Sequence, residues 1–161
     1  MHTWSEAETA APQLAADVRA RFEATGLGFL ATLRRDGWPR ISGIEPLFFD
    51  GELWLGMMPG SRKAADLRRD PRFALHAAST DTQVTEGDAK LGGRAVEVTE
   101  AAEHARYARA FKDHTGSEPG EGPFYLFRAE VLELSLLKPA GDHLDIAWWR
   151  AGGPVQQVER R

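Results

Sequence analysis

Apolar side chains recur at helical spacing in three segments of the chain. In the first segment, Leu14, Val18 and Phe22 are four residues apart and form one apolar stripe. Pro12 is favoured in the first turn of a helix, and Gly26 is a typical C-terminal stop. The same reasoning predicts helices over residues 12–25, 61–69 and 100–115.

The remaining apolar positions are typical of short β-strands separated by turns. Predicted strands cover residues 29–33, 38–49, 52–55, 72–78, 90–99, 124–137 and 143–150. The turns Asp36-Gly37 and Asp50-Gly51 separate the first three strands and predict an antiparallel meander. Gly92-Gly93 indicates a β-bulge in the fifth strand. The pattern therefore predicts a mainly β (α+β) fold, a small closed antiparallel barrel with peripheral helices.

Length and composition narrow the class of protein without identifying its chemistry. The chain has 161 residues, which fits a single domain with a core over about residues 12–150 and polar tails at residues 1–11 and 151–161. Cysteine is absent, so disulfides, thiolate metal sites and cysteine nucleophiles are excluded. The five histidines lack the spacing of a metal site, so no metal site is predicted.

Charge and hydropathy disfavour two classes of partner. Lys and Arg total 20 and Asp and Glu total 24, a net charge of −4 that disfavours an oligonucleotide-binding barrel. No apolar run approaches the roughly 20 residues of a membrane helix, and the acidic first residues lack an apolar signal core. We therefore expect a cytoplasmic protein that acts on a small molecule, without nucleic-acid or membrane partners.

The most informative segment is Pro59-Gly60-Ser61-Arg62-Lys63, which follows a predicted strand and opens a predicted helix. Free N–H groups in the first turn of a helix attract an anion. Ser61 adds a hydroxyl, while Arg62 and Lys63 add two cations that oppose the helix dipole. A bound phosphate would explain that conflict. The residues alone leave a solvated basic turn as an equal alternative.

Residues 51–64, with the sequence GELWLGMMPGSRKA, resemble the core of the pyridoxamine 5′-phosphate oxidase-like flavoproteins. The preceding hairpin, residues 29–42, resembles the first two strands of the same family, and the likeness extends over roughly residues 14–79. The resemblance implies a split β-barrel homodimer with two cofactor sites at the subunit interface. It also implies that FMN is held by its phosphate at Ser61, Arg62 and Lys63.

The resemblance implies further contacts along the cofactor. They come from the second strand, the strand end before the phosphate turn and the C-terminal segment: Arg40, Ser42, Gly56, Met57, Trp148 and Arg150. The last two would approach the flavin of the partner subunit. Glu45 stands where the family's oxidases carry Lys, and Gly56 stands where they carry Tyr. These departures argue against pyridoxamine phosphate as the substrate.

Three functions fit these features. The first, which we favour, is an FMN-dependent oxidoreductase of undefined substrate, in which the cofactor supplies the redox chemistry and no catalytic side chain is assigned. The second keeps the fold but uses an 8-hydroxy-5-deazaflavin coenzyme, whose phosphate-bearing tail would occupy the same turn. The third is a non-enzymatic flavin- or haem-binding protein, with His76 or His114 as a haem ligand.

Overall fold

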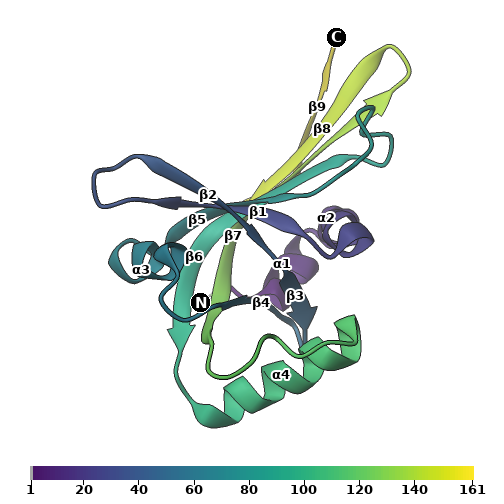
Figure 1. Cartoon of the computed structure of the whole chain (residues 1–161). Helices are drawn as coiled ribbons and strands as arrows, with labels where there is room; N and C mark the ends of the chain where they lie inside the picture. Colours follow the sequence, from purple (N-terminus) through teal and green to yellow (C-terminus); the bar gives the residue numbers. More distant parts are fainter. Residues whose placement is uncertain (1) are drawn as a thin grey trace.

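The computed structural model describes residues 2–161, which form four helices and nine strands (Figure 1). The helices are α1 (Trp4–Ala10), α2 (Pro12–Thr25), α3 (Arg62–Arg69) and α4 (Ala101–Thr115). The strands are β1 (Gly28–Leu33), β2 (Pro39–Ile44), β3 (Pro46–Phe49), β4 (Glu52–Met57), β5 (Arg72–Ala77), β6 (Asp88–Val98), β7 (Tyr125–Ala140), β8 (His143–Arg150) and β9 (Gln156–Arg160). The three predicted helices are confirmed, and the left-handed residues Gly26 and Gly116 end α2 and α4.

Within residues 2–161 every strand pair is antiparallel, and the path of paired strands runs β2-β1-β5-β6-β7-β4-β3. The 16-residue strand β7 organises this path because its two halves have different partners. Residues 125–128 pair with β4, whereas residues 133–140 pair with β8, which in turn pairs with β9. The β8–β9 hairpin therefore extends away from the body of the molecule (Figure 1). The predicted mainly β fold with peripheral helices is confirmed.

The predicted bulge in β6 is present, and it allows β6 to follow β7 along its length. The pairing register between the two strands shifts between Gly92 and Gly93. A Cβ atom on Gly93 would lie 1.8 Å from the backbone oxygen of Glu130. The close approach of the two backbones therefore requires glycine at this position.

One predicted strand, residues 38–49, is wrong because the structure divides it at Glu45. Residues 39–44 (β2) pair with β1, while residues 46–49 (β3) pair with β4 at the other end of the strand path. Pro46 opens β3 and has no N–H to donate to a continuous ladder. The two hairpins form as predicted, but they do not join into one meander. Glu45 consequently lies where the chain crosses from one end of the path to the other.

The N-terminal segment is not the polar tail that the sequence predicts. Residues 4–10 form α1, which begins with a capping box between Thr3 and Glu6. The side chain of Trp4 is only 1% exposed, and its ring centroid lies 4.6 Å from that of Phe48. Residues 156–160, by contrast, are exposed and form the strand β9. The N-terminal helix therefore completes the core, while the C-terminal strand lies outside it.

Two apolar clusters stabilise the molecule and position the helices around the sheet. The larger cluster packs α1 and α2 against the curved sheet. The smaller cluster lies beneath α4 and consists of Leu47, Trp54, Val98, Tyr107, Phe111 and Leu126. Helix α3 packs near β1 and presents its first turn toward the end of β2. None of the helices within residues 2–161 combines the length and apolar character that a membrane crossing requires.

Candidate functional site

The first turn of α3 brings the predicted phosphate residues together at one helix end. Ser61 is the N-cap residue, and its hydroxyl oxygen is buried without a hydrogen-bond partner among residues 2–161. Arg62 is exposed, and within the same residues it forms no hydrogen bond or ion pair. This turn contains no acidic side chain. It therefore combines unpaired backbone donors, a buried hydroxyl and a free guanidinium, which together suit an anion.

Lys63 extends this basic group toward the end of β2. Its Nζ donates to the backbone oxygen of Gly43 at 3.0 Å. Burial lowers the pKa of Lys63 because a partly desolvated ammonium is less stable than a solvated one. An anion placed beside Lys63 would restore the stability of the charged form.

A buried carboxylate, Asp66, fixes α3 against the sheet. Asp66 is 3% exposed and accepts hydrogen bonds from Thr32 Oγ1 at 2.8 Å, Arg40 Nε at 2.6 Å and Arg69 Nη2 at 3.1 Å. Burial by itself would raise the pKa of Asp66, but these three hydrogen bonds outweigh it and lower the pKa. No local sequence pattern marks Asp66 as a site residue, because its partners on β1 and β2 are 34 and 26 residues away along the chain.

This network also defines the surroundings of two residues predicted to contact a cofactor. The guanidinium of Arg40 is held against Asp66, so it supports α3 from the second strand. Ser42 lies two residues further along β2 and therefore on the same face of the strand as Arg40. Both side chains are partly buried.

A cavity of about 400 Å³ forms a second part of the candidate site on the outer side of β1, β5 and β8. It is lined by Trp148 and Arg150, together with Phe29, Ile41 and His76. Trp148 and Arg150 thus share one cavity, whose lining includes neither Ser61 nor Lys63. The ring nitrogens of His76 contact the backbone oxygen of Ala77 at 2.7 Å and Asp88 at 2.6 Å.

A cavity of about 320 Å³ lies between α3 and α4, at the ends of β2 and β4. Its lining includes Gly56, Met57 and Lys63, three of the predicted site residues, together with Glu45 from the crossover segment. Tyr107 from α4 forms its inner wall. The cavity begins at the basic turn of α3 and extends along the strand end that the sequence predicts to lie beside a cofactor.

Tyr107 accounts for the glycine at position 56. A Cβ atom on Gly56 would lie 2.4 Å from the Tyr107 hydroxyl oxygen, too close for any other residue type without movement. Burial raises the pKa of Tyr107, and the nearby charge of Glu45 raises it further, so the phenol stays protonated at neutral pH. The helical spacing of Tyr107 and Phe111 predicts only a core position for Tyr107, so the sequence does not mark it as a site residue.

The comparisons with known proteins agree with this geometry. The profile of the pyridoxamine 5′-phosphate oxidase family matches residues 14–138, which is most of the chain. A conserved hypothetical protein from Mycobacterium tuberculosis is 28% identical, with a TM-score of 0.59 over 70% of this chain and 77% of that one. A search of curated proteins found no significant match.

Two further solved structures share the fold at lower sequence identity. A pyridoxamine 5′-phosphate oxidase-related, FMN-binding protein from Nostoc punctiforme is 12% identical, with a TM-score of 0.61 over 94% of this chain and 96% of that one. ChuZ from Campylobacter jejuni is 16% identical, with a TM-score of 0.70 over 91% of this chain and 63% of that one. On the family profile and the shared architecture, the chain belongs to the pyridoxamine 5′-phosphate oxidase-like family of split β-barrel proteins.

Proposed function

We propose that this protein binds FMN by its phosphate at the first turn of α3 and acts as a flavin-dependent oxidoreductase on a small molecule. The observation that carries the proposal is the buried, unpartnered hydroxyl oxygen of Ser61 beside the free guanidinium of Arg62. A buried polar atom without a partner is costly, and a phosphate oxygen would satisfy it. The FMN-binding relative from Nostoc punctiforme supports the choice of cofactor.

The residues present fit such a cofactor in both of its parts. Ser61, Arg62 and Lys63 would hold the phosphate, while Gly56 and Met57 would lie along the rest of the molecule. Bound flavin would supply hydride or electron transfer. The chain's own residues would bind and orient it: Arg40 and Asp66 keep α3 in place, and Tyr107 closes the inner wall of the cavity.

We propose further that the working protein is a homodimer with a cofactor site at each side of the interface. Three large apolar side chains are exposed at the β1–β2 hairpin: Phe29 is 50% exposed, Trp38 is 68% exposed and Ile41 is 73% exposed. Apolar groups clustered in this way are typical of a protein interface. A second copy would cover them and would bring its Trp148 and Arg150 within reach of a neighbouring flavin.

A deazaflavin coenzyme is the second candidate, because the cavity beside Lys63 departs from that of the family's oxidases. Glu45 introduces a carboxylate into the lining where those oxidases carry Lys. Tyr107 fills the space behind Gly56, where they carry a Tyr on the strand itself. These differences alter the part of the cavity that would meet the ring system and leave the phosphate turn unchanged.

Haem binding receives less support from the structure. One relative of known structure, a haem-binding protein from Mycobacterium smegmatis, is 20% identical with a TM-score of 0.58, and this chain covers 57% of it. His76, a candidate haem ligand, has both ring nitrogens engaged by Ala77 and Asp88. A haem iron would have to displace one of those partners.

Titrations with FMN, riboflavin, the deazaflavin coenzyme and haem test these proposals directly. Riboflavin lacks the phosphate, so we expect FMN to bind at least about tenfold more tightly, the effect of one or two charge-assisted hydrogen bonds. Equal affinity for FMN and riboflavin would contradict phosphate binding at α3. Tighter binding of the deazaflavin than of FMN would favour the deazaflavin coenzyme as the cofactor. Binding of haem alone would favour a non-enzymatic role in storage or sensing over the proposed oxidoreductase.

A further inference from the structure

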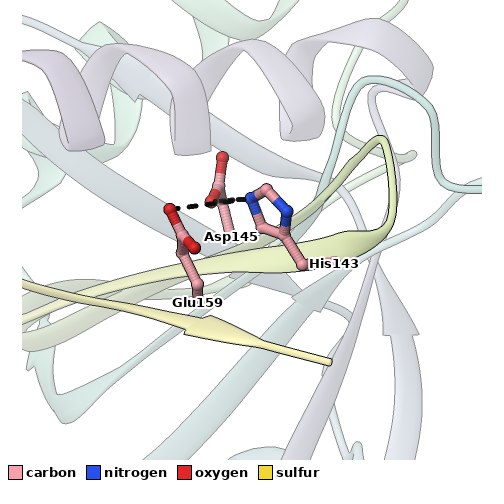
Figure 2. A group of neighbouring side chains, drawn as sticks. All are labelled: His143, Asp145 and Glu159. Carbon is pink, nitrogen blue, oxygen red and sulfur yellow. Dashed lines mark hydrogen bonds and ion pairs between the residues drawn. The ribbon is translucent and has the colours of Figure 1, made fainter.

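A histidine and two carboxylates meet on the β8–β9 extension, far along the chain from the basic turn of α3. His143 and Asp145 lie two residues apart on β8 and so share one face of that strand. Glu159 on β9 is directly opposite Asp145 in the pairing register. Figure 2 shows the imidazole and both carboxylates pointing toward one another.

The distances between these groups match those of metal ligands. His143 Nε2 lies 3.1 Å from Asp145 Oδ1 and 3.8 Å from Glu159 Oε1. One ligand atom from each residue lies within 4.8 Å of the other two. Ligands at about 2 Å from a tetrahedral zinc ion are about 3.3 Å from one another. Small side-chain rotations would therefore bring all three groups onto one ion.

The orientation of the imidazole also suits a metal. Asp142 Oδ1 lies 3.0 Å from His143 Nδ1, so the carboxylate can accept a hydrogen from that nitrogen. A ring that donates from Nδ1 to Asp142 and loses its other proton would present the lone pair of Nε2 toward Asp145 and Glu159. A carboxylate on the second ring nitrogen is the usual arrangement behind a metal-binding histidine.

Without a cation, the pairing of Asp145 with Glu159 is unfavourable. Like charges directly opposite on neighbouring strands repel each other. Lys138 is opposite Asp145 in the pairing register of β7 and β8, but its Nζ forms an ion pair with Glu86 at 3.9 Å. Arg161 Nη2 lies 3.8 Å from Asp142. Among the ion pairs of residues 2–161, His143 is the one partner of both Asp145 and Glu159, and a divalent cation would replace its proton.

Space for further ligands is present beside the cluster. Asp145 and Glu159 line a cavity of about 680 Å³ between α2 and the β8–β9 hairpin. Water or a small ligand could complete the coordination from this side. Such a site would be open rather than closed, because only three protein ligands are in place.

We propose that His143, Asp145 and Glu159 bind a divalent transition-metal ion such as Zn²⁺, with Asp142 positioning the imidazole. One imidazole and two carboxylates form a donor set that suits zinc. The ion would join β9 to β8 by a side-chain link in addition to their backbone hydrogen bonds. Because all of β9 is exposed, this link would be a main determinant of how firmly the C-terminal strand is held.

Calorimetric titration of Zn²⁺ into the full chain, free of a histidine tag and treated with chelator, tests the site. The hydrogen bond to Asp142 and the charges of Glu159 and Asp145 raise the pKa of His143 above its ordinary value of 6.5. The titration is therefore made well above that pH, so that protons compete weakly with the metal. We expect one equivalent to bind. His143→Gln and Glu159→Gln should each lower the affinity more than tenfold, and Asp142→Asn should lower it about tenfold although all three ligands remain. His114 is an exposed residue of α4. His114→Gln is the matched control and should bind Zn²⁺ as tightly as the unmodified chain does.

Hydrogen exchange supplies a second measurement that does not depend on the flavin. Saturating Zn²⁺ should slow exchange of the amides at residues 156–160 in the unmodified chain and in His114→Gln, but not in His143→Gln. Absence of Zn²⁺ binding, equal binding by His143→Gln and the unmodified chain, or unchanged exchange in β9 would each overturn the proposal. Far-ultraviolet circular dichroism spectra confirm that each variant is folded.

Discussion

At the scale of single residues, two side chains that carry no sequence signature hold the candidate site in place. Asp66 joins α3 to β1 and β2, and Tyr107 fills the space that a side chain at position 56 would need. Both are polar groups in buried surroundings, where an interaction is worth more than at the surface and its loss costs more. Substitutions at these two positions are therefore expected to affect the candidate site by lowering the stability of the fold around it.

Replacing Asp66 with Asn should lower the free energy of unfolding by about 2–3 kcal/mol, because Arg40 and Arg69 lose their shared carboxylate. Urea denaturation at neutral pH measures the change. Asp113→Asn, a matched substitution on the exposed face of α4, should change stability by less than about 0.5 kcal/mol. Equal effects of the two substitutions would contradict the role assigned to Asp66.

The pH dependence of stability should identify the same carboxylate. Hydrogen bonds from Arg40, Thr32 and Arg69 lower the folded-state pKa of Asp66 below its ordinary value of 3.8 despite the opposing effect of burial. The stabilisation is therefore fully present above about pH 3.8 and is lost as the pH falls through the folded-state pKa. Urea denaturation at a series of pH values gives the free energy of unfolding as a function of pH. This free energy should change less with pH in Asp66→Asn than in the unmodified chain.

A Cβ atom at position 56 should be destabilising because of Tyr107. Gly56→Ala is expected to cost about 1–3 kcal/mol of overpacking, since the Tyr107 ring is buried and cannot swing away. The double variant Gly56→Ala/Tyr107→Phe removes the oxygen that lies 2.4 Å from the new atom, and its loss should be smaller than the sum of the two single losses. Additive losses in thermal denaturation would show that the two positions do not interact.

At the scale of secondary-structure elements, α3 carries an electrostatic conflict that stability alone does not explain. Its first turn contains Arg62 and Lys63 and no acidic residue, although the partial positive charge of a helix N-terminus favours acidic side chains. The strand end before it supplies the cavity, and the turn between them, with left-handed Gly60, directs the first turn of α3 toward that cavity. The first turn of α3 is therefore better suited to binding an anion than to stabilising the helix.

Arg62→Glu should therefore change stability and cofactor binding in opposite directions. We expect the cofactor-free protein to gain about 0.3–1 kcal/mol of stability from the favourable interaction with the helix dipole. FMN affinity should fall more than tenfold, because a carboxylate would face the phosphate. Arg109→Glu makes the same charge change at an exposed position of α4 and should leave FMN affinity unaltered. An Arg62→Glu variant that binds FMN normally would place the phosphate elsewhere.

At the scale of the whole molecule, the two halves of the candidate site lie on different parts of one chain. Gly56, Met57 and Lys63 line one cavity, whereas Trp148 and Arg150 line another. Exposed apolar side chains surround the second cavity at the β1–β2 hairpin. A second copy of the chain offers the simplest way to cover these side chains and to complete the site.

Ile41→Asp should disrupt the proposed dimer and weaken FMN binding with it, because the charge would be buried in an apolar interface. Sedimentation measurements should register a shift toward the monomer mass, and flavin titration should register the loss of affinity. Val155→Asp introduces the same carboxylate at an exposed apolar position. Val155 lines the cavity between α2 and the β8–β9 hairpin, away from both parts of the candidate flavin site, so this substitution should affect neither property. A monomeric unmodified chain that binds FMN fully would contradict the interface.

The sequence alone determined the elements with local signals. Apolar spacing and the stop residues Gly26 and Gly116 predicted α2 and α4 closely, and the Asp-Gly turns predicted both hairpins. The Ser61-Arg62-Lys63 turn and the surrounding motif were sufficient to identify the family. These features depend on residues near one another along the chain, so their physical cause is contained in short segments.

Only the tertiary structure decided how distant segments meet. It divided residues 38–49 at Glu45, because β2 and β3 form opposite ends of the strand path and pair with β1 and β4 respectively. It buried Trp4 in the core, tied Asp66 to Arg40 and brought Glu159 to His143 and Asp145. Each of these contacts joins residues that no local pattern relates, because their energies arise from burial and pairing that exist only once the sheet has closed.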